Sequence, residues 1–249
     1  MTIIKSAEEI AIMREAGRIT AIVLQKMREA VKPGIKTRQL DALAEKEMRK
    51  YSAARPSFKG YHSFPASVCV SVNDEVVHGI PGNRVLNEGD IVSIDFGVIY
   101  KGFQGDAALT VGVGKVSEEA RSLMDITEAS LAEGINAARD GGSLGDIGAA
   151  IQSYVETRGC SVVREYSGHG IGRDMHEDPL IPNFGKKGDG MRLREGMTMA
   201  LEPMVNLGGW KTRVDANGWT VHSADGSLSA HFEHTIAIRR SDTEILTLL

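Results

Sequence analysis

The feature that most constrains the fold is an internal repeat, whose two copies are called the echo segments. The segment LNEGDIVSID (86–95) lines up with LREGMTMALE (193–202), so each copy has a turn glycine followed six residues later by a carboxylate. A His-Gly-Ile tripeptide precedes each copy, at 78–80 and at 169–171. Two matches in the same order favour two homologous halves that face each other across one site.

Predicted helices occur as one pair in each half. Ser6, with Glu9 three residues later, is a capping box that begins the first helix, and Pro33-Gly34 ends it. In the second half Ser117 caps a helix and Gly141-Gly142 ends it. The helices are predicted over 6–30, 37–50, 117–139 and 144–158.

Between and after the helix pairs lie segments with the composition of β-strands. They are ASVCVSV, DIVSIDFGVIY, MTMALEPMV and HFEHTIAI. No stretch has the composition of an interdomain linker, so residues 1–249 are predicted to form a single domain.

Composition excludes several classes of protein. A hydrophobic content of 42% and a charged content of 25% are those of a soluble globular protein. The net charge of −4 and the lack of a Lys/Arg-rich run argue against a nucleic-acid surface. No signal peptide or membrane span is evident. Two cysteines outside any CxxC pair fit a reducing cytoplasm.

Four carboxylates follow or lie within apolar segments. Asp95 ends the strand IVSID, Asp106 lies in the turn-like GFQGDAA, and Glu202 and Glu233 lie in later strands. One such acid alone would most often be a cap or a surface turn. Four of them, if they converged, would repel one another without a cation. With His169 they would suit two divalent ions, Mn, Fe, Co or Zn, rather than a structural zinc.

Other catalytic motifs are absent from the sequence. His176-Glu177 is not HExxH, because position 180 is Leu. No GxSxG provides a serine nucleophile. Cys69 lies in a predicted strand with no base beside it, which indicates core or pocket lining.

Several motifs in one order resemble the type I methionine aminopeptidases, in their short bacterial form. They are HGI at 78, DFG at 95, GD at 105, SGHGIGRDMHEDP, EGMTMALEPM and SAHFEHTIAI. The resemblance covers essentially the whole chain. It implies an α+β pita-bread fold, with two pseudo-symmetric halves, a central antiparallel β-sheet and outer helices.

The resemblance also implies roles for individual residues. Asp95 would bind one metal, Asp106 and Glu233 would bridge both ions, and His169 and Glu202 would complete the second site. His176 would hydrogen-bond the substrate at the scissile peptide, and His78 would contact the amide on the leaving side. Glu202 would also carry the proton. The methionine pocket would be lined by Phe58, Tyr61, Phe64, Cys69, Met175 and Trp219.

The implied activity is removal of the N-terminal methionine from nascent proteins and peptides with a small second residue, through hydroxide activated by two metal ions. A cytoplasmic monomer is the expectation, and an association with the ribosome would be compatible with it. An X-Pro aminopeptidase or prolidase shares the ligand set but usually has a large additional N-terminal domain. A pita-bread binding module without catalysis is a further alternative, but such modules lose metal ligands.

Two positions depart from the family pattern. Position 175 is often aromatic and is Met here, and position 231 is often Gln and is His here. Because side chains alternate along a strand, Ser229, His231 and Glu233 are predicted to share one face. His231 would then be either a solvated histidine at the rim of the cleft, or a neighbour of the metal ligands or of the substrate residue that follows methionine.

Overall fold

The computed structural model describes residues 3–249. Its four α-helices agree with the predicted pairs to within two residues. Ser6 caps the first helix in a capping box with Glu9, and Ser117 caps the third. No helix in the described part of the chain is both long and apolar enough to cross a membrane. The helices are α1 (Ala7–Ala30), α2 (Thr37–Met48), α3 (Glu118–Ala137) and α4 (Leu144–Glu156).

The strands are short except for the hairpin of β4 and β5, and a single 3₁₀ turn, η1, precedes β2. In chain order they are β1 (Ala54–Pro56), η1 (Tyr61–Ser63), β2 (Cys69–Val72), β3 (Glu75–Val77), β4 (Ile91–Tyr100), β5 (Phe103–Gly112), β6 (Ser161–Val162), β7 (Gly168–Gly170), β8 (Glu177–Ile181), β9 (Thr198–Leu201), β10 (Met204–Asn206), β11 (Thr212–Val214), β12 (Val221–Ser223), β13 (Ser229–His231), β14 (Glu233–Ile238) and β15 (Thr243–Ile245).

The main sheet has the order β1-β4-β5-β14-β9-β7-β8, with β2 also paired to β4 and β15 to β14. Its pairings are antiparallel, as predicted. The two halves meet where β5 pairs with β14. On either side of this seam, β4 beside β5 corresponds to β9 beside β14. The repeated segments of the sequence therefore occupy equivalent places in one continuous sheet.

Further contacts repeat across the seam. The bridge Lys36–Val85 joins the start of α2 to the residue before the first echo segment, and Ser143–Arg192 does the same for α4 and the second. Each half also has its own core. One cluster of buried side chains packs α1 and α2 onto β4, and another packs α3 and α4 onto β9 and β14.

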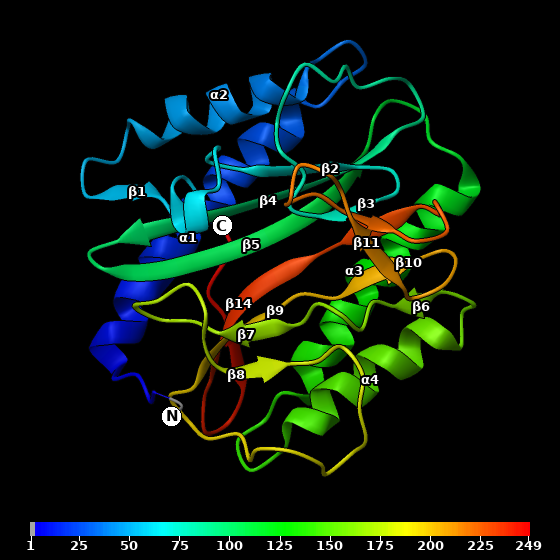
Figure 1. Ribbon diagram of the computed structural model, residues 1–249. Coiled ribbons are helices and arrows are strands. Elements are labelled where there is room, and N and C mark those ends of the chain that lie inside the picture. The colour runs from blue at the N-terminus through cyan, green and yellow to red at the C-terminus, as the bar shows by residue number, and fades with distance from the viewer. Residues whose placement is uncertain (1–2) are drawn as a thin grey trace.

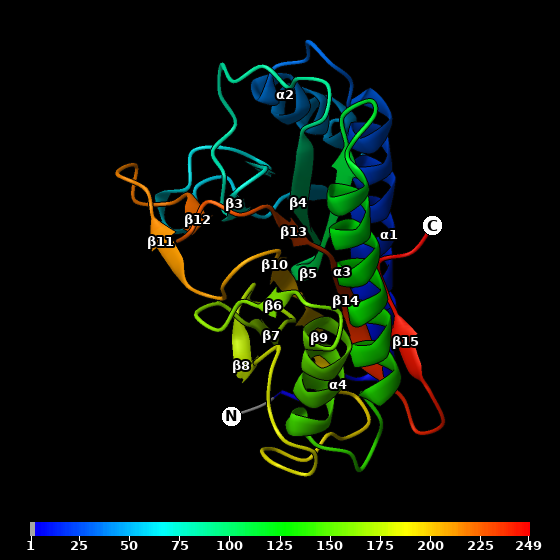
Figure 2. The ribbon, with the colours of Figure 1, turned by 90° about the vertical axis from the view of Figure 1, so that its right-hand side faces the viewer.

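The helices cover one side of the sheet. Figure 1 shows α1 and α2 with the first half and α3 and α4 with the second. In the turned view, α1 and α3 lie on one side of β5 and β14, and β11 and β12 lie on the other (Figure 2). The side away from α1 and α3 is thus free to carry the site. The α+β pita-bread prediction is confirmed.

Two predicted strands and one predicted turn are wrong in detail. The segment 197–205 splits into β9 and β10 around Glu202-Pro203, and 231–238 splits at Phe232, so that β13 and β14 pair in different sheets. Asp106 lies within the strand β5 and not in a turn. Its neighbours Gly105 and Ala107 have weak strand propensity, which cross-strand pairing on both edges of β5 overrides.

Candidate metal and substrate site

Every predicted site residue lines one cavity of about 390 Å³. The cavity lies at the centre of the sheet, where the two halves meet. His62, next to Tyr61, lines it too, although no motif pointed to it. The lining residues are Phe58, Tyr61, His62, Phe64, Cys69, His78, Asp95, Asp106, His169, Met175, His176, Glu202, Trp219 and Glu233.

The five predicted metal ligands come from five neighbouring strands. Asp95 lies in β4, Asp106 in β5 and Glu233 in β14, while His169 lies in β7 and Glu202 directly follows β9. Atoms of Asp106, His169 and Glu233 that could bind a metal all lie within 4.8 Å of one another. The sheet order therefore places residues from distant parts of the sequence around one point.

Side-chain hydrogen bonds hold the backbone at these positions. The Thr235 hydroxyl accepts from the Asp106 N–H at 2.9 Å and donates to the Asp106 carbonyl at 2.7 Å, which fixes β5 against β14. The Asn183 amide donates to the Glu202 carbonyl at 3.0 Å. The carboxylates of Asp106 and Glu202 are therefore carried by backbone that is itself restrained.

The carboxylates lack the partners that buried acids require. Asp95 Oδ1, Asp106 Oδ1 and Glu233 Oε1 are buried and have no hydrogen-bond partner. Burial and then the charge of Glu202 raise the pKa of Asp106 to about 8, and burial raises that of Glu202 to about 8. Burial, followed by Asp106, also raises the pKa values of Asp95 and Glu233 well above normal. Partnerless oxygens around one point fit divalent cations.

The hydrogen bond and the protonation state of His169 suit it to act as a metal ligand. Its Nδ1–H donates to the Gly170 carbonyl at 2.9 Å, which leaves the lone pair on Nε2. Burial, followed by the neighbouring His176, lowers its pKa to about 3, so the imidazole is neutral at pH 7. Its Nε2 lies 3.6 Å from Glu202 Oε1. A neutral imidazole with a free Nε2 beside carboxylates suits metal binding.

We expect the metal-free protein to lose stability as pH rises from about 6.5 to 8. An acid whose folded pKa is raised binds its proton more tightly folded than unfolded, so deprotonation favours unfolding. Asp106 and Glu202 act in this way up to about pH 8. His78 and His169, lowered to about 4 and 3, oppose the effect only below the ordinary histidine pKa of about 6.5.

Melting temperatures measured with a chelator between pH 6.5 and 8 would check this expectation. Saturating divalent metal should flatten the decline, because the cation replaces the proton as the partner of the acids. The variant Glu8→Gln, which changes an exposed acid on α1, should keep the slope of the original protein. A melting temperature that is constant or rises over this range would contradict the expectation.

One wall of the cavity is apolar. Phe58, Phe64 and Met175 are buried, and the Phe64 ring meets Trp219 edge-on with centroids 5.1 Å apart. Cys69 packs in the same cluster, and burial, followed by the charge of Asp95, raises the pKa of its thiol. A neutral thiol is a poor nucleophile. Cys69 is therefore suited to lining and not to covalent catalysis.

The two His-Gly-Ile copies need glycine for the same reason. A Cβ on Gly79 would lie 2.2 Å from the Val70 carbonyl oxygen, and one on Gly170 would lie 2.4 Å from that of Asp178. In both tripeptides the neighbouring backbone therefore comes too close for any residue other than glycine. His78, whose φ is +60°, lies at the cavity edge. Burial and then His231 lower the pKa of His78 to about 4, so it is neutral at pH 7.

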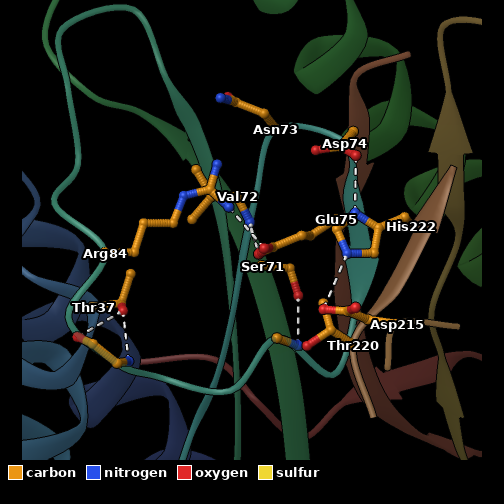
Figure 3. Close-up of polar contacts among 12 residues, drawn as sticks. Thr37, Ser71, Val72, Asn73, Asp74, Glu75, Arg84, Asp215, Thr220 and His222 are labelled. Carbon is orange, nitrogen blue, oxygen red and sulfur yellow. Dashed lines mark hydrogen bonds and ion pairs between the residues drawn. The ribbon is translucent and has the colours of Figure 1, made fainter. Parts of the chain in front are cut away.

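A polar network outside the cavity supports His78 and Trp219. His222 in β12 lies 2.9 Å from Asp74 Oδ2 through its Nδ1 (Figure 3). Glu75, at the start of β3, accepts from Arg84 at 2.7 Å. The His222–Asp74 contact joins the β11–β12 hairpin, whose strands flank Trp219, to the residue before β3, and the Glu75–Arg84 contact joins β3 to the segment that follows His78. Both contacts lie close in sequence to His78 or Trp219, which line the cavity.

His231 lies beside the candidate ligands and not at the rim. It is only 1% exposed, and its Nε2 lies 3.5 Å from Glu202 Oε2. The solvated alternative is therefore wrong. His231 and Glu233 do not belong to one continuous strand, because the chain breaks at Phe232 between β13 and β14. Thr110 holds His231 instead, exchanging hydrogen bonds of 2.8 and 2.9 Å with its backbone.

A buried ion pair that no motif indicated anchors the segment before β8. Lys5 pairs with Glu177, and both side chains are almost fully buried. Glu177 also accepts from the Arg173 N–H at 2.9 Å. The pair joins residues 172 positions apart, so sequence spacing gave no signal of it. It restrains the loop that carries Met175 and His176.

The sequence profile of metallopeptidase family M24 matches residues 11–240. The chain therefore belongs to metallopeptidase family M24 and is a metal-dependent hydrolase. The methionine aminopeptidase of Clostridium acetobutylicum is 52% identical over 249 residues, covering 100% of this chain and 99% of that protein. Within the family, this chain groups with the methionine aminopeptidases, as the sequence motifs predicted.

Solved structures agree with this assignment. The crystal structure of methionine aminopeptidase from Thermotoga maritima has a TM-score of 0.98 and 45% identity, covering 100% of both chains. A prolidase from Pyrococcus furiosus has a TM-score of 0.80 at 23% identity, and 66% of that chain is covered. The second likeness shows a shared fold alone.

Proposed function

We propose that this protein removes the N-terminal methionine from nascent proteins and peptides, with a preference for a small second residue. The observation that carries the proposal is the group of partnerless buried carboxylate oxygens facing an apolar wall in one cavity. The two methionine aminopeptidases named above, 52% and 45% identical to this chain and covered over 99% and 100% of their length, support the same activity. We further propose that residues 1–249 act as one catalytic domain, as a cytoplasmic monomer compatible with ribosome association.

Two divalent ions, Mn, Fe, Co or Zn, would be held by five residues in this proposal. Four carboxylate charges balance two such ions. When bound, they supply Lewis acidity and lower the pKa of water toward neutrality. The residues are Asp95, Asp106, His169, Glu202 and Glu233.

The remaining groups would handle the substrate. His78 and His176 are both shifted toward the neutral form by burial, so each can share hydrogen bonds with a peptide without bringing a charge. His176 would stabilise charge that develops on the scissile carbonyl oxygen, and His78 would hold the amide on the leaving side. Glu202, with a raised pKa, could take up a proton and return it to the leaving amine.

The apolar wall would receive the methionine side chain. The predicted lining residues, Phe58, Tyr61, Phe64, Cys69, Met175 and Trp219, all face the cavity. A thioether makes favourable contacts with aromatic rings, and Met175 offers a softer wall than an aromatic residue would. This arrangement suits an unbranched apolar side chain.

Hydrolysis of Met-Ala-Ser by metal-loaded protein, compared with X-Pro peptides, tests the proposal. We expect free methionine from Met-Ala-Ser and little product from X-Pro peptides, and a bulky second residue as in Met-Trp-Ser should slow release. Preferential X-Pro cleavage would favour the prolidase alternative. No cleavage of either peptide, with ions demonstrably bound, would favour a binding module.

A further inference from the structure

Tyr61 and His176 meet across the cavity from opposite halves of the chain. Tyr61 begins η1, and His176 lies just before β8. The Tyr61 hydroxyl lies 2.8 Å from Nδ1 of His176, and the two rings stack with centroids 5.5 Å apart at 24°. We propose that Tyr61 is a positioning residue whose hydroxyl donates to Nδ1 of His176 and so keeps the ring proton on Nε2. This inference rests on the proposed function, in which His176 contacts the substrate.

The direction of this hydrogen bond follows from the chemistry of its two partners. A phenol is the better donor and a neutral imidazole nitrogen the better acceptor, so O–H···N is the favoured arrangement. Burial, and then the charge of Asp174, raise the pKa of the Tyr61 phenol, which therefore keeps its proton. The ring of His176 is open to the cavity mouth, yet partial burial and then His62 lower its pKa, which favours neutral imidazole.

The tautomer decides what the second nitrogen of His176 can do. With the proton on Nε2, His176 donates a hydrogen bond, as the carbonyl oxygen of a bound peptide requires. With the proton on Nδ1, Nε2 would offer a lone pair, which would repel that oxygen and compete for metal. The same choice is made in the opposite sense at His169, where a carbonyl acceptor at Nδ1 leaves the lone pair on Nε2.

Two histidines seven residues apart thus receive opposite tautomers from opposite partners. Their ring centroids are only 4.2 Å apart, although His169 is buried and His176 is exposed. One Nδ1 faces an acceptor, the Gly170 carbonyl, and the other faces a donor, the Tyr61 hydroxyl. This difference accounts for one of the pair being suited to bind metal and the other to bind substrate.

The backbone beneath His176 has its own support, so the hydroxyl of Tyr61 can be removed without freeing the loop. The buried Lys5–Glu177 pair and the bond from the Arg173 N–H to Glu177 hold residues 173–177. The variant Tyr61→Phe also keeps the ring that stacks on His176. It should therefore change the tautomer and leave the shape of the apolar wall almost unaltered.

The experiment measures the tautomer directly and activity beside it. Long-range proton–nitrogen NMR on zinc-loaded protein with nitrogen-15 histidine reports which ring nitrogen carries the proton, and the signals missing in His176→Ala identify the residue. We expect His176 to be protonated on Nε2 in the original protein and to become a mixture of tautomers in Tyr61→Phe. A proton on Nδ1 in the original protein, or an unchanged tautomer in the variant, would overturn the proposal.

For Met-Ala-Ser we expect kcat of Tyr61→Phe to fall roughly 10- to 100-fold, the scale for outer hydrogen-bond partners of site histidines. KM should change little, because the ring remains. In a His176→Ala background the same substitution should have almost no further effect, and Tyr100→Phe, outside the cavity lining, should have none. An equal loss in both backgrounds would show that Tyr61 acts without His176. The NMR result needs no substrate, so failure of the proposed activity is distinguishable from failure of this inference.

Discussion

Asp106→Asn should lose nearly all activity and much of the bound metal. The substitution keeps the shape of the side chain but replaces a carboxylate with a neutral amide at a residue that is 4% exposed. Oδ1 of Asp106 has no hydrogen-bond partner, and atoms of His169 and Glu233 lie within 4.8 Å. Loss of this charge should reduce turnover by more than about 100-fold, above the usual range for residues outside the ligand set.

Metal content after dialysis, counted by mass spectrometry, and hydrolysis of Met-Ala-Ser would be measured on the same sample. Asp125→Asn makes the same chemical change on the exposed face of α3 and should leave both quantities unaltered. An Asp106→Asn protein with full metal content and full turnover would end the metal-site assignment. A variant that keeps its metal but loses turnover would show that Asp106 acts in catalysis without being needed to hold the ions, and would contradict the predicted loss of metal.

His78→Ala should lower kcat by about 100-fold or more, the scale for a positioned polar catalytic group, without loss of metal. His78 faces the cavity from beside β3, and its ring contacts are with Tyr166 and Trp219, at centroid distances of 5.9 and 6.3 Å. It thus lies on the aromatic side of the cavity and not among the carboxylates. Its pKa of about 4 makes it a neutral hydrogen-bonding partner at pH 7.

Steady-state kinetics and metal titration by calorimetry would separate an effect on turnover from an effect on metal binding. His62→Ala, at the histidine of the cavity lining to which the motifs gave no role, should have a much smaller effect on kcat. A His78→Ala protein that releases its ions would show that His78 supports the metals. Normal turnover in the same variant would show that it has no part in the reaction.

Local signals in the sequence predicted the helix pairs and the two echo segments well. Caps such as Ser6 and Ser117 are local, and the turn glycines Gly89 and Gly196 both have φ near +90°, which favours glycine. The ligand set came from a resemblance of whole motifs, and the sheet order accounts for its convergence. The helix caps and turns depend on residues close in sequence, whereas the convergence of the candidate ligands depends on the pairing of distant strands.

Features that depend on pairing between distant segments could not be predicted. An alternating pattern does not say which sheet a strand joins, so the breaks at Pro203 and Phe232 were missed. The burial of His231 follows from contacts with Thr110 and Glu202, which no spacing reveals. The Lys5–Glu177 pair is of the same kind. Tertiary contacts decided each of these cases.

The seam between β5 and β14 makes the sheet the single-chain counterpart of a two-fold symmetric dimer. Asp95 and Asp106 come from one side, and Glu202 and Glu233 occupy the equivalent places on the other. Because one chain encodes both sides, each can change independently, as two identical subunits cannot. The imidazole of His169 is thus contributed by one side only, while its motif counterpart, His78, contacts the rings of Tyr166 and Trp219. Covalent joining of the halves has permitted an asymmetric centre within a symmetric frame.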